Sequence, residues 1–217
     1  MIINYYLIHC LEHIERIDHI KKIIKYLGNP IQIVEGIYTK SIDLNKETQL
    51  DFMKKFDSNI EFKNTFTFKL SGQIGCYLSH HLLIKKLLQQ EHHNYSVLFE
   101  DDVKWNITDL HSSIINVINS LNLEDWDIVF LGNLTNNHGK VFKNNIYYLD
   151  PRIPCFGTHS LLINNNKLDK IYRHNCLVRH EIDTHYKILI DCNKLNGFVI
   201  YPPLCFQNNN LKSNIKK

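Results

Sequence analysis

Short apolar segments alternate with longer segments of helical periodicity from the N-terminus to about residue 132. The pattern predicts an apolar strand over 2–8, a helix over 11–27 that stops at Gly28, and a second strand over 31–34. The buried stripe of this helix is predicted to consist of Ile14, Ile17, Ile24 and Leu27. Because strands that alternate with helices pair side by side with the helices packed outside, the pattern predicts an α/β fold with parallel neighbouring strands.

The alternation resumes after an irregular insertion over 39–69, which carries a helix near 46–56. Ser71 is predicted to cap a helix that runs to about residue 90, and a strand follows over 95–99. Thr108 is predicted to cap the next helix. The rest of the chain predicts a strand over 127–131, a hairpin over 141–149, helices near 166–172 and 183–190, and strands over 158–163 and 197–201.

Composition limits the class of protein. Of the 217 residues, 44% are hydrophobic and 22% charged, as expected for one soluble globular domain. The net charge is only +3, and neither the other lysines nor the basic tail of Lys212, Lys216 and Lys217 has the interleaved aromatic residues of a nucleic-acid surface. The six cysteines form no CxxC pair, which argues against a zinc knuckle and suits a reducing compartment. Without a signal-peptide pattern or a run of transmembrane length, we expect a cytoplasmic protein.

Three adjacent carboxylates, Glu100, Asp101 and Asp102, follow directly on the apolar strand 95–99. Open α/β sheets bind their ligands outside the carboxyl ends of their strands, which is where this triplet falls. Alternation along an extended chain places Glu100 and Asp102 on one side and Asp101 on the other. Two converging carboxylates suit a hard cation such as Mg²⁺ or Mn²⁺. The alternative is a solvated acidic turn or a helix N-cap.

Several sequence blocks resemble, in the same order, those of glycosyltransferase family 25, which includes lipooligosaccharide and collagen hydroxylysine galactosyltransferases. They are SGQIGCYLSH at 71–80, VLFEDDV at 97–103, DWDIVFLG at 125–132, GTHSLLI at 157–163, and EID at 181–183 with YPPL at 201–204. The N-terminal region departs from the family pattern, since His9 and Cys10 stand where Asn and Leu are usual. Gln73 stands where a Glu is usual.

The resemblance implies a single GT-A-type domain over 1–217, with a Rossmann-like, mostly parallel sheet flanked by helices. It implies a nucleotide-sugar half over about 1–132 and an acceptor half over about 133–210. It further implies transfer of a hexose, galactose or glucose, from a UDP-sugar in the presence of Mn²⁺ or Mg²⁺. The acceptor would be a hydroxyl of a saccharide or of hydroxylysine, and the anomeric carbon would be inverted.

The family-like blocks also suggest roles for individual residues around the acidic triplet. Asp102 is the predicted direct metal ligand, and Glu100 is a second ligand, directly or through water. Gln207 lies where enzymes of this type often place a late ligand to the metal or the diphosphate. Asp101 is predicted to bind the ribose or the donor sugar instead.

A single inverting displacement requires a base that takes the proton from the acceptor hydroxyl. Asp183 is the predicted base and Glu181 its substitute, with capping of the following helix as the alternative for Asp183. His159 contacts the donor phosphate or the acceptor, or is a hydrogen-bonded core histidine. Ser79 and His80 either line the donor site or pack the helix that carries them.

A non-catalytic domain that keeps this fold and binds a glycan or a protein partner is the alternative to an enzyme. The intact acidic triplet argues against it, because a buried acidic cluster without a metal costs stability through mutual repulsion. A glycoside hydrolase would need two carboxylates flanking the sugar, and nothing in the sequence pairs them.

Overall fold

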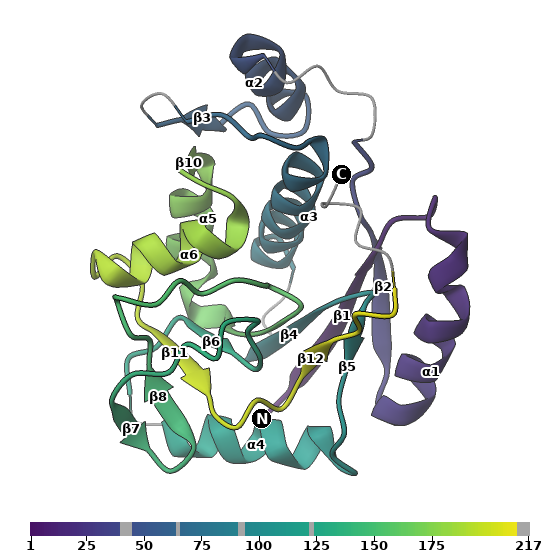
Figure 1. The fold of residues 1–217 in the computed structure, drawn as a ribbon, viewed down its shortest axis with the longest axis vertical. Helices are drawn as coiled ribbons and strands as arrows, with labels where there is room; N and C mark the ends of the chain where they lie inside the picture. The colour runs from purple at the N-terminus through teal and green to yellow at the C-terminus, as the bar shows by residue number, and fades with distance from the viewer. Residues whose placement is uncertain (40–44, 64–65, 91–93, 122–123, 212–217) are drawn as a thin grey trace.

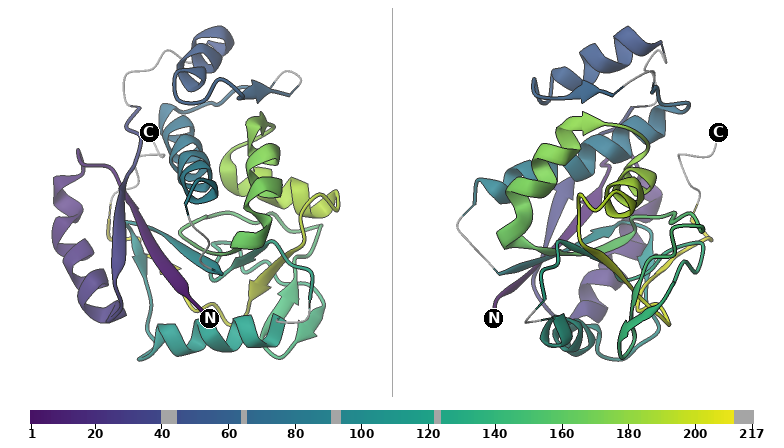
Figure 2. Two further views of the ribbon diagram at one scale, coloured as in Figure 1. Left: turned by 180° about the vertical axis from the view of Figure 1, so that it is seen from behind. Right: turned by 90° about the vertical axis from the view of Figure 1, so that its left-hand side faces the viewer.

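The computed structural model describes residues 1–39, 45–63, 66–90, 94–121 and 124–211 of the chain. The predicted basic tail of Lys212, Lys216 and Lys217 lies outside the described residues. A large sheet crosses the molecule, and helices cover both of its faces (Figures 1 and 2). The predicted α/β class, a sheet flanked by helices, is therefore confirmed. None of the helices in the described ranges combines the length and apolar character needed to cross a bilayer.

The large sheet has eight strands in the spatial order β2-β1-β4-β9-β6-β11-β8-β7. In that order they are Ile31–Glu35, Ile3–His9, Tyr95–Glu100, Ser160–Asn164, Ile128–Phe130, Gly197–Ile200, Ile146–Tyr148 and Val141–Lys143. Strands β9 and β8 run against the other six. Two small sheets are separate from it, the β5–β12 ribbon of Val103–Lys104 with Phe206–Gln207 and the pair of β10 (Leu177–Val178) with β3 (Glu61–Phe62).

Two apolar cores lie on the two faces of the sheet, and each is closed by its own helices. On one face pack α3 (Ser71–Leu88), α5 (Leu168–Cys176) and α6 (Ile182–Asp191), with α2 (Lys46–Lys54) beyond them; on the other pack α1 (Ile17–Leu27) and α4 (Leu110–Leu121). In β4, Leu98 joins the first core and Val97 the second, as the alternation of a pleated strand requires. A strand buried on both faces is mostly apolar, which explains why Ser96 is the only polar residue from Tyr95 to Phe99, before the acidic triplet.

The predicted buried stripe of α1 is wrong in part. Ile14, Ile17 and Ile24 are 70%, 40% and 40% exposed, whereas Ile20, Ile23 and Leu27 are buried. The reason is that Ile14 belongs to a separate 3₁₀ turn, Ile14–Arg16, and the α-helix begins only at Ile17. The predicted stop is confirmed, because Gly28 closes the helix in the left-handed conformation with φ +68°.

The two predicted helix caps are each displaced by one residue. Ser71 is the first residue of α3, and its N-cap is Leu70. The side chain of Gln73 satisfies the free backbone there by accepting the N–H groups of Lys69 and Leu70 at 3.1 and 3.0 Å. At α4 the cap is Asp109, whose carboxylate accepts the Ser112 N–H at 2.9 Å, and not its neighbour Thr108.

Strand β9 enters the sheet between β4 and β6, antiparallel to both. Its amino end therefore lies beside the carboxyl end of β4, with Ser160 opposite Phe99 and the Glu100 N–H donating to the His159 carbonyl at 3.1 Å. This reversal brings the segment before β9 to the acidic triplet that ends β4.

Candidate active site

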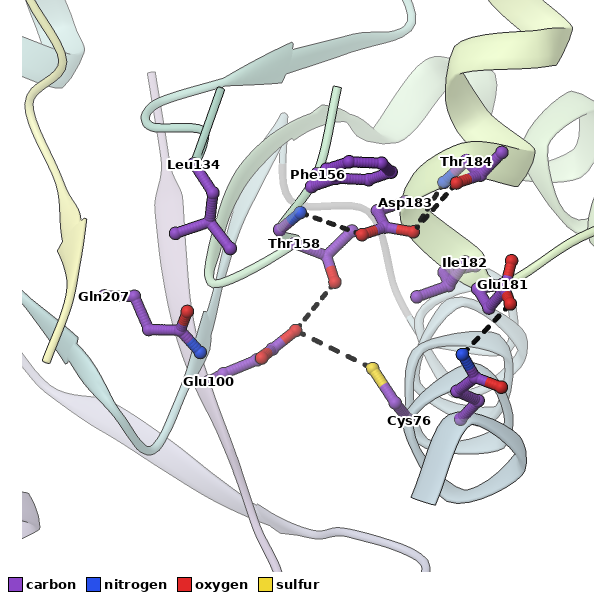
Figure 3. Close-up of a pocket in the computed structure, with 12 residues that line it drawn as sticks. Cys76, Glu100, Leu134, Phe156, Thr158, Glu181, Ile182, Asp183, Thr184 and Gln207 are labelled. Atoms are coloured by element: carbon purple, nitrogen blue, oxygen red, sulfur yellow. Dashed lines mark hydrogen bonds between the residues drawn. The ribbon is translucent and has the colours of Figure 1, made fainter. Parts of the chain in front are cut away.

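A cavity of about 300 Å³ opens at the carboxyl end of β4 (Figure 3). It contains four of the residues predicted for the site, Glu100, Gln207, Glu181 and Asp183. The other lining residues are Gln73, Cys76, Leu134, Phe156, Gly157, Thr158, Ile182 and Thr184. Residues from distant parts of the sequence thus meet at the sheet edge where open α/β folds bind ligands.

Glu100 is held by one of its two carboxylate oxygens. Its Oε1 accepts hydrogen bonds from His80 Nε2 at 3.0 Å, Thr158 Oγ1 at 2.7 Å and Cys76 Sγ at 3.9 Å. Among the described residues, no hydrogen bond reaches Oε2. Burial raises the pKa of Glu100, but the His80 and Thr158 contacts outweigh it and lower the pKa below its usual value. The group is therefore an oriented carboxylate, with one oxygen left for a ligand.

The three donors to Glu100 come from two elements. Cys76 and His80 are four residues apart on α3, so they lie on the same face of that helix. Thr158 comes from the turn before β9. The α3 helix is itself fixed against the end of β2, because a Cβ at Gly75 would lie 2.4 Å from the Ile37 carbonyl oxygen.

Asp102 lies beside Gln207 at the end of the β5–β12 ribbon. Its Oδ2 accepts the Gln207 side-chain amide at 2.9 Å, and its backbone carbonyl accepts the Asn208 N–H at 2.7 Å. Its Oδ1 is buried and has no hydrogen-bond partner in the described chain. Burial and the charge of Glu100 raise the pKa of Asp102. An unpaired carboxylate oxygen next to a second carboxylate is a position that suits a cation.

Asp101 lies in the turn after β4 and does not line the cavity. Its two oxygens accept His9 Nδ1 at 2.7 Å and Arg16 Nη1, and the side chain is buried. Arg16 Nη1 also lies 3.8 Å from Asp102 Oδ2. Asp101 therefore joins the acidic turn to β1 and to the turn before α1, and its predicted contact with the donor stays a prediction.

Asp183 and Glu181 form the opposite wall at the start of α6. Asp183 Oδ2 accepts the Gly157 N–H at 2.9 Å, and Oδ1 accepts the Thr184 N–H at 2.6 Å. Burial raises the pKa of Asp183; these two bonds oppose the increase, and Glu100 and Glu181 add to it. Glu181 accepts Gln73 Nε2 on one oxygen at 3.0 Å and His180 Nδ1 on the other at 2.8 Å.

The turn at 156–158 links the two walls of the cavity. Gly157 donates its N–H to Asp183, and the next residue, Thr158, donates its hydroxyl to Glu100. Gly157 has φ +91°, a conformation that other residues rarely adopt, and a Cβ there would lie 3.0 Å from the Leu134 side chain. The glycine therefore lets one tight turn hold both carboxylates.

The three remaining predicted residues lie behind the cavity lining. Ser79 Oγ donates to the Gly75 carbonyl at 2.7 Å and accepts the Ile37 N–H at 2.8 Å, which favours its packing role. His80 is buried and orients Glu100. His159 is also buried, and burial lowers its pKa. A direct contact of any of them with the donor stays a prediction.

Several cavity residues were not predicted as site residues from the sequence. Cys76 and Thr158 lie inside the family-like blocks, so the blocks were a signal, although nothing marked these two as partners of Glu100. Leu134 and Phe156 lie in loops, where an apolar residue belongs to no periodic pattern that could be read from the sequence.

The sequence model that describes glycosyltransferase family 25 (LPS biosynthesis protein) matches residues 2–185 of this chain. The chain belongs to glycosyltransferase family 25. The predicted family is thus confirmed, and with it the enzyme class of glycosyltransferase. The departures at His9, Cys10 and Gln73 fall within the matched range and do not remove the chain from the family.

Several solved structures are similar to this chain at low sequence identity. A197 from STIV is 10% identical with a TM-score of 0.53, covering 99% of this chain and 87% of its own. A glycosyltransferase involved in glycosylation of the major capsid of PBCV-1 is 11% identical with a TM-score of 0.49, over 98% of this chain and 95% of its own. A Drosophila galactosyltransferase 7 mutant in complex with manganese, UDP-Gal and xylobiose is 10% identical with a TM-score of 0.45, covering 100% of this chain and 72% of its own. No curated protein matches the sequence.

Proposed function

We propose that the protein transfers a hexose, galactose or glucose, from a UDP-sugar to an acceptor hydroxyl, with a divalent cation at Glu100 and Asp102. The observation that carries the proposal is the state of these two carboxylates. Asp102 has an oxygen, Oδ1, without a partner in the described chain, and Glu100, which lines the cavity, has a free oxygen, Oε2. Family membership supplies the reaction class.

The donor set fits a hard cation. Glu100 and Asp102 offer carboxylate oxygens, and the side-chain amide of Gln207 borders both the cavity and Asp102. Oxygen ligands of this kind select Mg²⁺ or Mn²⁺ over softer metals. When bound there, such a cation neutralises the charge that develops on the diphosphate leaving group.

Asp183 is the proposed base. Its raised pKa makes it a better proton acceptor near neutral pH than an ordinary carboxylate. It would take the proton from the acceptor hydroxyl while the hydroxyl oxygen forms the new bond to the anomeric carbon. The anomeric C–O bond to the diphosphate breaks, and its electron pair leaves with UDP. Because the hydroxyl would attack the opposite face of the anomeric carbon in a single displacement, the configuration would be inverted. Glu181 remains the substitute; both of its oxygens accept hydrogen bonds, as do both oxygens of Asp183.

The cavity also supports the proposed division of a single domain. Glu100 and Cys76 come from the nucleotide-sugar half, about 1–132, whereas Phe156 and Asp183 come from the acceptor half, about 133–210. The donor would thus bind toward β4, and the acceptor toward α6.

Thermal unfolding with UDP, GDP, CMP and TDP, each with and without Mn²⁺, tests the proposal. We expect UDP to raise the melting temperature only when Mn²⁺ is present, and we expect Asp102→Ala to lose that increase. Glu124→Gln, at an exposed position, is the control that should keep it. A folded protein that binds none of the nucleotides would support the alternative of a non-catalytic domain that binds a glycan or a protein.

A further inference from the structure

Three side chains of different chemistry meet at the carboxyl end of β4, and we call Cys76, His80 and Glu100 the Cys76 cluster. A thiol sulfur, a ring nitrogen and a carboxylate oxygen, one from each residue, lie within 4.8 Å of one another. Cys76 and His80 are one turn apart on α3, and Glu100 is the last residue of β4. Because α3 and β4 both pack into the same apolar core, the fold sets the mutual position of these atoms.

The distances within the Cys76 cluster are close to those around one tetrahedral ion. Glu100 Oε1 lies 3.0 Å from His80 Nε2 and 3.9 Å from Cys76 Sγ. At the usual Zn²⁺ bond lengths, a tetrahedral ion separates a nitrogen from an oxygen ligand by about 3.4 Å and a sulfur from an oxygen ligand by about 3.6 Å. Small side-chain shifts therefore suffice to bring the three atoms onto one ion.

The hydrogen bonds of the Cys76 cluster mark the place that an ion would take. His80 and Cys76 both donate to Glu100 Oε1, and the same oxygen accepts Thr158 Oγ1 at 2.7 Å. A carboxylate oxygen has about two lone-pair sites, so three donors exceed its capacity. An ion in place of the His80 and Cys76 protons would leave this oxygen with one metal bond and the Thr158 hydrogen bond, as is usual for a ligating carboxylate. The His80 proton can move to Nδ1, which has no hydrogen-bond partner in the described chain.

The Cys76 cluster differs in chemistry from the position of Glu100 and Asp102. It uses Oε1 of Glu100, whereas the cation of the proposed function is assigned to the free Oε2. A thiolate and an imidazole favour a borderline-soft ion such as Zn²⁺ over the hard ions that oxygen ligands select. Cys76 and Glu100 line the cavity, which gives an ion an entry path and room for water as a fourth ligand (Figure 3).

A second cluster of similar composition, Asp57, His81 and Cys176, already contains a cation. Lys85 Nζ lies 3.2 Å from Asp57 Oδ2, so a divalent ion there would meet the lysine charge. None of its three residues lines the cavity. The second cluster is therefore the internal control for the first.

We propose that the Cys76 cluster is a separate metal site, which binds Zn²⁺ or a cation of similar softness through Cys76, His80 and Glu100. The inference goes beyond the proposed function, because it assigns a different ion to different ligand atoms and requires no nucleotide.

Absorption spectroscopy of the full chain with Co²⁺, without nucleotide, tests the site. Cobalt bound by a thiolate gives a charge-transfer band, and we expect this band in wild type and its loss when Zn²⁺ is added. Cys76→Ser should abolish the band and weaken Zn²⁺ binding, measured by isothermal titration calorimetry, at least about tenfold. The matched controls, Cys176→Ser in the second cluster and Cys192→Ser at an exposed cysteine, should keep both. Circular dichroism establishes that each variant is folded.

X-ray absorption of zinc bound to wild type makes the test independent of the variants. We expect one sulfur ligand at about 2.3 Å and nitrogen or oxygen ligands at about 2.0–2.2 Å. Absence of a thiolate band in wild type, a band that survives in Cys76→Ser, loss of the band in folded Cys176→Ser, or a zinc ion without a sulfur ligand would each overturn the site.

Thermal unfolding with UDP and Mn²⁺ separates failure of this site from failure of the proposed function. If wild type binds UDP with Mn²⁺ but gives no cobalt band, the Cys76 cluster is not a metal site and the proposed function stands. If the cobalt band depends on Cys76 but UDP does not bind, the metal site stands and the proposed function is wrong.

Discussion

Two adjacent histidines of α3 hold two carboxylates in different parts of the molecule. His80 donates to Glu100 in the cavity, and His81 donates to Asp57 near the region of α2 and α5, at 3.0 and 2.8 Å. Consecutive residues of a helix point in different directions, so one helix serves both places. Each cluster also contains a cysteine, Cys76 or Cys176, with the potential ligand atoms within 4.8 Å of one another. By composition alone, the two clusters are equivalent.

The two clusters differ in whether both oxygens of the carboxylate accept hydrogen bonds. Asp57 Oδ2 accepts His81, Tyr172 and Lys85 at 2.8, 2.8 and 3.2 Å, and Oδ1 accepts the Asn59 N–H at 3.1 Å. Both oxygens are used, so this carboxylate holds elements of the fold together. Glu100 has all its donors on one oxygen, and the other is left at the cavity. We therefore assign Glu100, which keeps an oxygen without a hydrogen bond, as the cation ligand and Asp57, whose two oxygens are both used, as structural.

Glu100→Gln should show the largest effect. It keeps the size of the side chain but removes the charge that the cation and the diphosphate require. We expect UDP release from UDP-galactose or UDP-glucose to fall at least about a thousandfold. The measurement is the rate of UDP release by wild type and variant, with Glu124→Gln as the control. Equal rates in wild type and Glu100→Gln would remove the distinction between the two clusters.

Asp57→Ala should affect stability and not the site. Removing a buried carboxylate leaves the His81, Tyr172 and Lys85 donors without their partner, so the free energy of unfolding should fall by about 3 kcal/mol. Urea denaturation measures the loss, and UDP binding by the folded protein should be unchanged. Asp18→Ala removes an exposed ion pair with Lys21 and should change little. Loss of UDP binding in stably folded Asp57→Ala would show that the clusters are coupled.

The pH dependence of unfolding should identify Asp57 as a stabilising anion. Burial raises its pKa, but the hydrogen bonds from His81, Asn59 and Tyr172 outweigh burial and lower the pKa from 3.8 to about 2. The folded state thus favours the charged form, and this stabilisation is present above pH 4 and lost as the pH falls toward 2. The stability difference between wild type and Asp57→Asn should shrink over that window in urea titrations at successive pH values. A difference that is constant from pH 5 to pH 2 would contradict this account.

Asp102→Asn should have the smallest effect, and of opposite sign. The raised pKa of Asp102 means that its ionisation costs folded-state stability at higher pH. Without metal, the variant should be more stable than wild type by about 1 kcal/mol at pH 8 and equal to it at about pH 3, because the cost of ionising Asp102 sets in as the pH rises from about 4 to about 7. Added Mn²⁺ should stabilise wild type alone. Calorimetry at both pH values measures this, and a variant less stable than wild type at pH 8 would argue against repulsion from Glu100.

The sequence predicted the α/β class and most of the elements, because these depend on local periodicity. It did not predict that β9 lies between β4 and β6, since pairing joins segments far apart in the chain. The exact caps were missed where two adjacent residues could both cap, as at Thr108 and Asp109.

The candidate site was predicted only in part, because its residues come from segments that lie far apart in the chain. The acidic triplet follows from its place after an apolar strand, but its hydrogen-bond partners come from α3 and from the turn at Thr158. Nothing in the pair His80-His81 indicates which ring faces the cavity, because that depends on the rotation of α3 against the sheet. Phe156 could be recognised only once its exposed place at the cavity was visible.

Electron paramagnetic resonance of free Mn²⁺ tests the central claim most directly, because it measures how much cation the protein binds in the presence of UDP. Wild type and Asp57→Asn should bind Mn²⁺ equally, and Glu100→Gln should bind it at least about tenfold more weakly. Binding by Glu100→Gln that equals wild type, or its loss in Asp57→Asn, would contradict the assignment of the open carboxylate as the ligand and the saturated one as structural.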